Sequence, residues 1–265
     1  MSNKRKIAAL ALVVCLAVAG WTGYMGVSEL LERKSGMDYY ADLALEVPVI
    51  EQATATPKPT ATPEPEQDAP QDVAAERPLL DFDALRVRFP DIVGWIAIEG
   101  SQINYPVVQG VDNDFYLTHL PDKEKNSAGS IMMDVSCEPH FASAVTILHG
   151  HNMRSGAMFG SLDAYALEDY YEEHPMLQLS TPGKNYDVEL FCATVVDSRT
   201  FGYPTSFDDE KDFDAFIAEL RRNSEFESDV EVAFGDRLLM LSTCAYAFDD
   251  ARLVVVGKIV DDAQA

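Results

Sequence analysis

The strongest constraint on the fold is a series of short apolar segments that recur, with turn-forming residues between them, from residue 93 to residue 259. The sequence Thr181-Pro182-Gly183-Lys184 is a tight-turn signal that predicts a β-hairpin. The segments predicted as strands are Val93–Ile98, Tyr105–Gln109, Gly129–Met133, Ala144–His149, Met176–Ser180, Tyr186–Val196, Arg237–Thr243 and Leu253–Ile259. So many short strands in fewer than about 190 residues favour a closed or nearly closed β-barrel over an alternating βαβ sheet.

Helices are fewer, and the pattern predicts them at Asp81–Arg88, Leu162–Tyr171 and Phe207–Arg222. The last is the clearest, because acidic residues 208–210 fill its first turn and two arginines fill its last turn. That distribution suits the helix dipole at both ends. Its apolar residues follow the helical period and predict one face that packs on the barrel: Phe213, Phe216, Ile217 and Leu220.

The N-terminus predicts a membrane anchor. A basic tail, residues 1–6, includes Lys4-Arg5-Lys6 and precedes an uncharged run of 21 residues at 7–27. A helix of this length spans a bilayer core of about 30 Å. A cleaved signal peptide is the main alternative. Basic residues retain their side of the anchor in the cytoplasm, so the rest of the chain is expected outside the cell.

Residues 28–78 are predicted to form an extracellular stalk rich in Pro and Thr. Between Glu51 and Pro78 the chain carries no large aliphatic or aromatic residue beyond one valine. Such a segment cannot bury enough surface to offset its ordering entropy, and its prolines keep it extended. Residues 79–265 are therefore expected to form one domain that holds its core without the stalk.

The charge excludes one class of partner. The chain has 44 Asp and Glu residues against 20 Lys and Arg, a formal net charge of −24. Binding to phosphates requires a basic face, so no nucleic acid partner is expected.

The number of cysteines indicates that at least one thiol has no disulfide partner within the chain. Cys15 lies in the apolar N-terminal run, which leaves Cys137, Cys192 and Cys244 in the exported domain. An odd number means that one thiol is free or pairs between chains. Cys192 lies in an apolar run and is predicted to be buried, whereas Cys137 lies in a polar loop. A disulfide between these two remains open.

Three residues form a candidate catalytic set. Cys244 directly follows one predicted strand and Arg252 opens the next, so the two are expected on the same rim of the barrel. A neighbouring guanidinium favours the nucleophilic thiolate or stabilises a developing oxyanion. His151 follows Gly150, which lets the chain bend after the strand that ends at His149. A Cys/His pair suffices for acyl transfer through a thioester, since the imidazole can protonate the leaving amine and activate the incoming nucleophile.

These residues resemble the sortase family, and within it class B. The resemblance is carried by Leu241-Ser242-Thr243-Cys244, the arginine at 252, Gly150-His151-Asn152-Met153, Met158-Phe159-Gly160, Val93-Gly94-Trp95-Ile96, Ile103-Asn104-Tyr105-Pro106-Val107-Val108-Gln109-Gly110 and Ala128-Gly129-Ser130-Ile131. The helix expected before the cysteine strand is similar to the extra helix that marks class B.

The resemblance implies a mainly β fold, an eight-stranded sortase barrel with a few flanking helices. It implies a cysteine transpeptidase that cleaves a C-terminal sorting motif of secreted proteins and transfers the protein to an amine of a lipid-linked peptidoglycan precursor. His151, Cys244 and Arg252 match the family's catalytic positions. Ser242 matches a residue that lines the substrate groove, and Ser198 and Tyr203, in the loop before the class B helix, are candidates for contacts with the sorting motif. A single-pass enzyme on the surface of a Gram-positive cell follows from the same resemblance.

Other functions are also considered. His149 and His151 form a His-x-His pair, but no further ligand lies at zinc spacing, so neither a metal nor a cofactor is expected. A pilin-polymerising sortase and a hydrolytic cysteine protease share the chemistry and differ in the acceptor. A non-enzymatic surface β-domain on a stalk fits everything except the Cys/His/Arg set.

Overall fold

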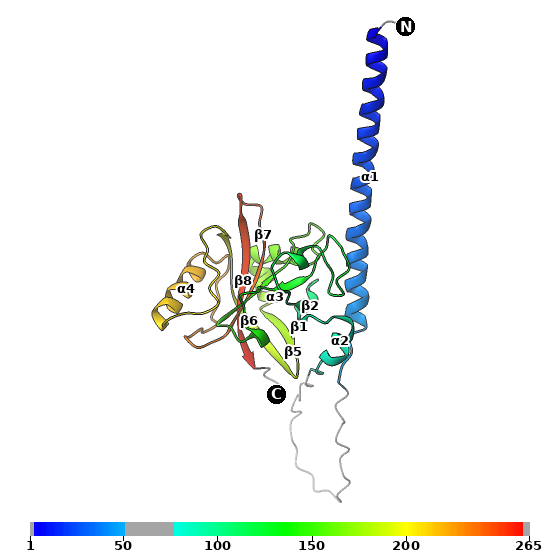
Figure 1. Ribbon diagram of the computed structural model, residues 1–265. Coiled ribbons are helices and arrows are strands. Elements are labelled where there is room, and N and C mark those ends of the chain that lie inside the picture. Colours follow the sequence, from blue (N-terminus) through cyan, green and yellow to red (C-terminus); the bar gives the residue numbers. More distant parts are fainter. Residues whose placement is uncertain (1–2, 51–76, 262–265) are drawn as a thin grey trace, which may run out of the picture.

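The computed structural model describes residues 3–50 and 77–261, and its centre is a closed eight-stranded barrel (Figure 1). The strands are β1 (Ile92–Ala97), β2 (Asn104–Val108), β3 (Ile131–Met133), β4 (Val145–His149), β5 (Met176–Thr181), β6 (Lys184–Asp197), β7 (Leu238–Cys244) and β8 (Ala251–Asp261). Their order around the barrel is β1-β2-β3-β4-β7-β8-β6-β5. All eight predicted strands are confirmed, with ends that differ from the prediction by at most two residues.

The register of the strands determines which residues meet at the rim. β2 and β3 run parallel, as do β4 and β7, and the other neighbours are antiparallel. β5 and β6 form the predicted hairpin, in which Thr181 pairs with Lys184 and Gly183 adopts φ +81°. A positive φ is costly for residues other than glycine, which explains Gly183 in this turn.

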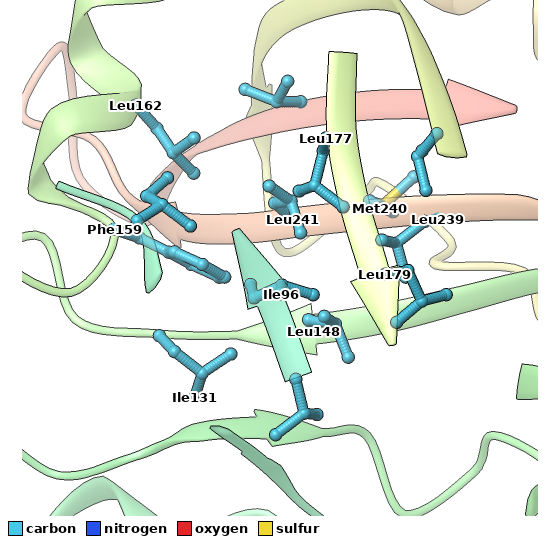
Figure 2. Close-up of a cluster of buried hydrophobic side chains, with 14 of the residues drawn as sticks. Ile96, Ile131, Leu148, Phe159, Leu162, Leu177, Leu179, Leu239, Met240 and Leu241 are labelled. Atoms are coloured by element: carbon cyan, nitrogen blue, oxygen red, sulfur yellow. The ribbon is translucent and has the colours of Figure 1, made fainter. Parts of the chain in front are cut away.

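The barrel interior is filled by aliphatic and aromatic side chains (Figure 2). Along β5 buried and partly exposed residues alternate, and Leu177 and Leu179 point inward. β7 is buried at every position from Leu238 to Thr243. This strand lies between β4 and β8, so its last residue, Cys244, is held on a rigid support.

The helices are α1 (Asn3–Leu45), α2 (Phe82–Arg88), α3 (Glu168–Glu173) and α4 (Glu210–Arg222), with short 3₁₀ turns η1 (Phe115–Leu117), η2 (Pro139–Phe141) and η3 (Gly160–Ala166). The predicted helix Leu162–Tyr171 is divided between η3 and α3, because Leu167 adopts an extended conformation between them. Figure 1 shows α4 and α1 on opposite sides of the barrel.

Helix α4 begins three residues later than predicted. Asp209 adopts an extended conformation and its side chain accepts a hydrogen bond of 3.0 Å from the backbone N–H of Asp212. Asp209 is therefore the N-cap, and the helix begins at the next residue. The predicted apolar face is buried at Phe213, Ile217 and Leu220.

Helix α1 differs from the predicted division into anchor and stalk. It continues from the predicted anchor to Leu45, and residues after 50 up to 76 lie outside the described part of the chain. Tyr40 and Leu43 are buried in the main hydrophobic core. The expectation that the core lies wholly within residues 79–265 is therefore wrong, because an amphipathic turn inside the supposed stalk packs on the barrel.

The anchor predicted for residues 7–27 falls in the first half of α1, and the side chains of residues 7–14 lie outside the described part. Among the helices that are described, none is both long and apolar enough to cross a membrane.

Candidate active site

Cys244 and Arg252 face each other across two antiparallel strands. Cys244 is the last residue of β7, and its partner in the register with β8 is Arg252. Directly opposed residues of an antiparallel pair carry their side chains on the same face, with Cβ atoms about 4.5–5.5 Å apart. The six-residue connection between β7 and β8 closes this hairpin. It brings Cys244 and Arg252 to opposite positions, although they are separated in the sequence.

His151 is held beside the same rim by backbone contacts. Its Nε2 lies 2.7 Å from the carbonyl oxygen of Leu117. A carbonyl oxygen only accepts, so Nε2 carries the proton and Nδ1 is the nitrogen that remains for proton exchange. The Thr243 hydroxyl donates a hydrogen bond of 2.7 Å to the carbonyl of Gly150, which ties the histidine segment to β7.

Gly150 is required for close packing. A Cβ at this position would lie 2.5 Å from Ile131 Cδ1 and 2.7 Å from Phe159 Cδ2. Glycine at this position thus has a steric reason, since a side chain there would push the histidine segment away from β3 and from Phe159.

Asn152 joins the histidine segment to the cysteine. Its Nδ2 donates to the carbonyl of Cys244 at 2.8 Å and to the Asp163 carboxylate at 3.0 Å. The Tyr246 hydroxyl donates to the carbonyl of Asn152 at 3.3 Å. Together with Thr243, these bonds hold the thiol and the imidazole in one fixed relation.

A pocket of about 390 Å³ opens where these elements meet. It contains every site residue predicted from the sequence, together with several that were not predicted. Its lining residues are Asn113, Leu117, Met132, Asp134, His149, Gly150, His151, Ser198, Tyr203, Ser242, Thr243, Cys244 and Arg252. Arg252 is the only lysine or arginine among these described lining residues, so it supplies the positive charge of the pocket.

The three predicted substrate contacts, Ser242, Ser198 and Tyr203, all line the pocket. The Tyr203 and Ser242 hydroxyls are 3.2 Å apart and share a hydrogen bond. Burial raises the pKa of Tyr203, so its phenol stays neutral and can donate or accept. The Ser198 N–H donates to the carbonyl of Asp250 at 3.0 Å, which links the loop before α4 to the connection between β7 and β8.

His149 and Asp134 form a pair in the same pocket that the sequence did not indicate. His149 Nε2 lies 2.8 Å from Asp134 Oδ2, and Asn113 and Ser136 also donate to this carboxylate. The hydrogen bond from His149 is the largest cause that holds the pKa of Asp134 well below its ordinary value. His149 is therefore engaged by a carboxylate, and it is 26% exposed.

The other two cysteines of the domain are buried and unpaired. Cys137 and Cys192 are free thiols, as is Cys244. Burial raises the pKa of Cys137, and it raises that of Cys192 to about 12. Thiolate character is therefore suppressed at both, whereas Cys244 lines an open pocket.

Comparisons with known proteins agree with this architecture. The sequence profile of the Sortase domain matches residues 96–260. Sortase B of Listeria monocytogenes is 36% identical over 172 residues, which is 64% of this chain and 70% of the relative. Sortase B of Staphylococcus aureus is 36% identical over 181 residues, which is 68% of this chain and 74% of the relative.

Solved structures show the same fold. The Staphylococcus aureus sortase B–substrate complex is 35% identical and covers 69% of this chain and 85% of its own, with a TM-score of 0.65. Sortase B from Bacillus anthracis in complex with AAEK1 is 30% identical and covers 88% of this chain and 100% of its own, with a TM-score of 0.71. The chain therefore belongs to the sortase family, and it is a cysteine transpeptidase of the class B type.

Proposed function

We propose that Cys244 is the nucleophile, His151 the general acid and base, and Arg252 the cation that stabilises the oxyanion. The observation that carries this assignment is the direct pairing of Cys244 with Arg252 across β7 and β8, with His151 lining the same pocket. The buried state of the other two thiols of the domain supports Cys244 as the reacting one.

The reaction proceeds in two steps. The Cys244 thiolate attacks a backbone carbonyl of the substrate, and the negative charge on the carbonyl oxygen is stabilised by the Arg252 guanidinium. The C–N bond breaks as His151 protonates the leaving amine, and a thioester remains. An incoming amine then attacks the thioester and gives up its proton to His151, which releases the acylated amine and restores the thiolate.

The substrate is a secreted protein with a C-terminal sorting motif, and the acceptor is an amine of a lipid-linked peptidoglycan precursor. Support comes from solved structures of sortase B, one from Staphylococcus aureus described as a substrate complex and one described as a complex with triglycine. Ser242, Ser198 and Tyr203 contact the bound motif, which is supported by their position in the lining of the pocket that holds Cys244.

Mass-spectrometric capture of the acyl-enzyme tests this assignment. The full chain, purified in detergent, is incubated with a library of sorting-motif peptides, with and without an added amine. We expect an adduct on the peptide that contains Cys244, and transfer to the amine when it is present. No adduct with any peptide would refute the proposed chemistry, and hydrolysis unaffected by the amine would indicate a protease instead.

The proposed location is the cell membrane, with a basic cytoplasmic tail at 1–6, an anchor at 7–27 and the catalytic domain outside. The basic residues and the uncharged run that follows support this topology. Protease added to intact cells should cut between residues 51 and 78. A soluble mature protein that begins near Ser28 would show that the run is a cleaved signal.

A further inference from the structure

The last part of α1 is bonded to the segment 116–130, which connects η1 to β3. The Tyr40 hydroxyl donates a hydrogen bond of 2.6 Å to the carbonyl of Gly129 and lies 3.2 Å from Ser130 Oγ. Nearer the N-terminus of the helix, the Glu32 carboxylate accepts a hydrogen bond of 3.0 Å from the Ser127 N–H. The helix therefore holds this segment at two points, one of them buried.

Gly36 lies between these two points and allows the helix to approach closely. A Cβ on Gly36 would lie 2.6 Å from Asn126 Oδ1 and 2.8 Å from Ala128 Cβ. Real Cβ atoms do not come this close, so any side chain would lift the helix from the segment. A Cβ on Gly26, in the same helix, would have no neighbour within 4 Å.

The segment 116–130 holds the catalytic histidine. The carbonyl of Leu117 accepts the hydrogen bond from His151 Nε2 at 2.7 Å. The two arms of the segment are bonded to each other, because the Ser130 N–H donates to the carbonyl of Tyr116 at 2.8 Å. Gly129 also packs on the backbone of Leu117, where a Cβ would lie 2.6 Å from the carbonyl oxygen. A displacement at Gly129 is thus passed to the group that orients His151.

Helix α1 also lies close to the chain that follows His151. Tyr40 and Met153 line one cavity of about 260 Å³ between the helix and the barrel. The Tyr40 ring packs edge-on against Tyr105 at 5.2 Å, and the Tyr105 hydroxyl accepts a hydrogen bond of 2.9 Å from the Met158 N–H. The helix therefore borders both the segment 116–130 and the chain that follows His151.

We propose that residues 32–45 of α1 position His151 for proton transfer, through the segment 116–130 and its Leu117 carbonyl. This inference rests on the proposed role of His151. The N-terminal helix is then a part of the active site's support and not only a tether. Proton transfer depends steeply on geometry, so a displacement of about 1 Å lowers the rate on the order of 10²-fold.

Gly36→Ala in the full chain, purified in detergent, tests the proposal, with Gly26→Ala as its matched control. Both changes favour the helix itself, because alanine has a higher helix propensity than glycine. They differ only in the contact with the segment. We expect Gly36→Ala to lower kcat by about 10-fold to 100-fold with KM changed less than about 2-fold, and Gly26→Ala to match the wild type. Wild-type kcat in Gly36→Ala would overturn the proposal.

Tyr40→Phe provides a milder variant that keeps the packing and removes the hydrogen bond to Gly129. Its control is Tyr171→Phe, which loses a hydrogen bond of 2.8 Å to Ser228 Oγ outside the active-site pocket. Thermal unfolding is measured for both, and they should lose similar stability. We expect kcat to fall several-fold only in Tyr40→Phe, and an equal loss of activity in both variants would overturn the proposal.

A double-mutant cycle shows whether the effect passes through His151. The readout is the rate at which iodoacetamide alkylates Cys244, followed by mass spectrometry of its peptide. Gly36→Ala should slow alkylation in the wild-type background and have no further effect in His151→Ala. An equal effect in both backgrounds would overturn the route through the histidine. Failure of the proposed function would look different, because the wild-type chain would then form no acyl-enzyme at all.

Discussion

At the residue scale, the two histidines on either side of Gly150 lie in the same pocket but have different partners. His149 donates to the carboxylate of Asp134, whereas His151 donates to a backbone carbonyl. The bond of His149 ties it to a carboxylate, with which it forms part of a larger hydrogen-bond cluster, whereas the bond of His151 to a carbonyl fixes the proton on Nε2 and directs Nδ1 to proton exchange.

This difference predicts the ranking of two substitutions. His151→Ala should lower the transpeptidation rate by more than the ~10²–10⁴-fold typical of one general acid or base, because both half-reactions use the imidazole. His149→Ala should reduce stability more than rate, since it leaves Asp134 without its main partner. Steady-state kinetics and urea unfolding of both purified variants measure the ranking, and the reverse order would overturn the assignment.

Arg252 should act through directed hydrogen bonds. A lysine would supply a similar point charge, but only the planar guanidinium presents a fork of donors to an oxyanion or a substrate carbonyl. Arg252→Lys should therefore lower the transpeptidation rate on the order of 10²–10³-fold, the scale of one lost oxyanion donor. Alkylation of Cys244 by a small neutral reagent forms no oxyanion and should change much less. Near-wild-type transfer by Arg252→Lys would leave only an electrostatic role.

Asp134 predicts how stability depends on pH. Its pKa in the folded protein lies well below the ordinary value of 3.8, chiefly because His149 donates to it. The contribution of the Asp134 carboxylate to the free energy of unfolding is therefore fully present above about pH 4. It is lost as the pH falls through the pKa of the folded state. Asp134→Asn should lower the free energy of unfolding by about 1–3 kcal/mol at pH 6. Urea titrations should show that the difference in free energy of unfolding between the variant and the wild type becomes smaller below about pH 4. A difference that does not depend on pH would contradict this account.

At the scale of elements, the site depends on how β4 and β7 are joined. These strands run parallel, with His149 paired to Ser242, so their C-terminal ends reach the same rim. β8 then returns antiparallel and brings Arg252 to that rim. The proposed catalytic residues come from three neighbouring strand ends, each supported by a strand in the closed barrel.

Gly150 tests the packing at the end of β4. In Gly150→Ala the new methyl group would overlap Ile131 and Phe159. Overpacking of this kind costs about 1–3 kcal/mol, and the shift should also move His151. We expect a lower thermal midpoint together with a lower kcat. Gly23→Ala, where a Cβ meets nothing within 4 Å, is the control and should behave as the wild type. Unchanged kinetics in Gly150→Ala would show that the histidine segment adjusts freely.

At the scale of the whole molecule, α1 and the barrel form one folded unit. Tyr40 and Leu43 share the main core with residues of the barrel strands. Their burial joins a helix that begins near the N-terminus to barrel strands that begin only at residue 92.

Two truncations measure what this packing contributes. Removal of residues 1–50 exposes the barrel surface under Tyr40 and Leu43. It should lower the free energy of unfolding by at most about 3–6 kcal/mol, since each such buried side chain contributes about 1.5–3 kcal/mol. Removal of residues 1–27 alone keeps the docked part of α1 and should leave the stability unchanged. Identical urea midpoints for the two truncated chains would show that α1 adds nothing to the fold.

Local patterns in the sequence were enough to predict the strands, the turn of the hairpin at Gly183 and the Cys/His/Arg set, whereas Ser242, Ser198 and Tyr203 were predicted from the resemblance to the sortase family. These features depend on local chemistry: turn residues end the strands, and the alternation of apolar residues reports which face is buried. The Cys/His/Arg set could be recognised because β7 and β8 follow each other in the sequence. The end of β7 and the start of β8 therefore lie at the same rim.

The partners of those residues could be learned only from the folded chain. The proximity of Asp134 to His149, of the Leu117 carbonyl to His151 and of Tyr40 to Gly129 joins positions that are 15, 34 and 89 residues apart. No local pattern encodes such contacts, because a backbone carbonyl carries no signal in the sequence and a tyrosine in a helix looks the same whether it is exposed or docked. They arise when the barrel closes and its loops pack against one another and against α1.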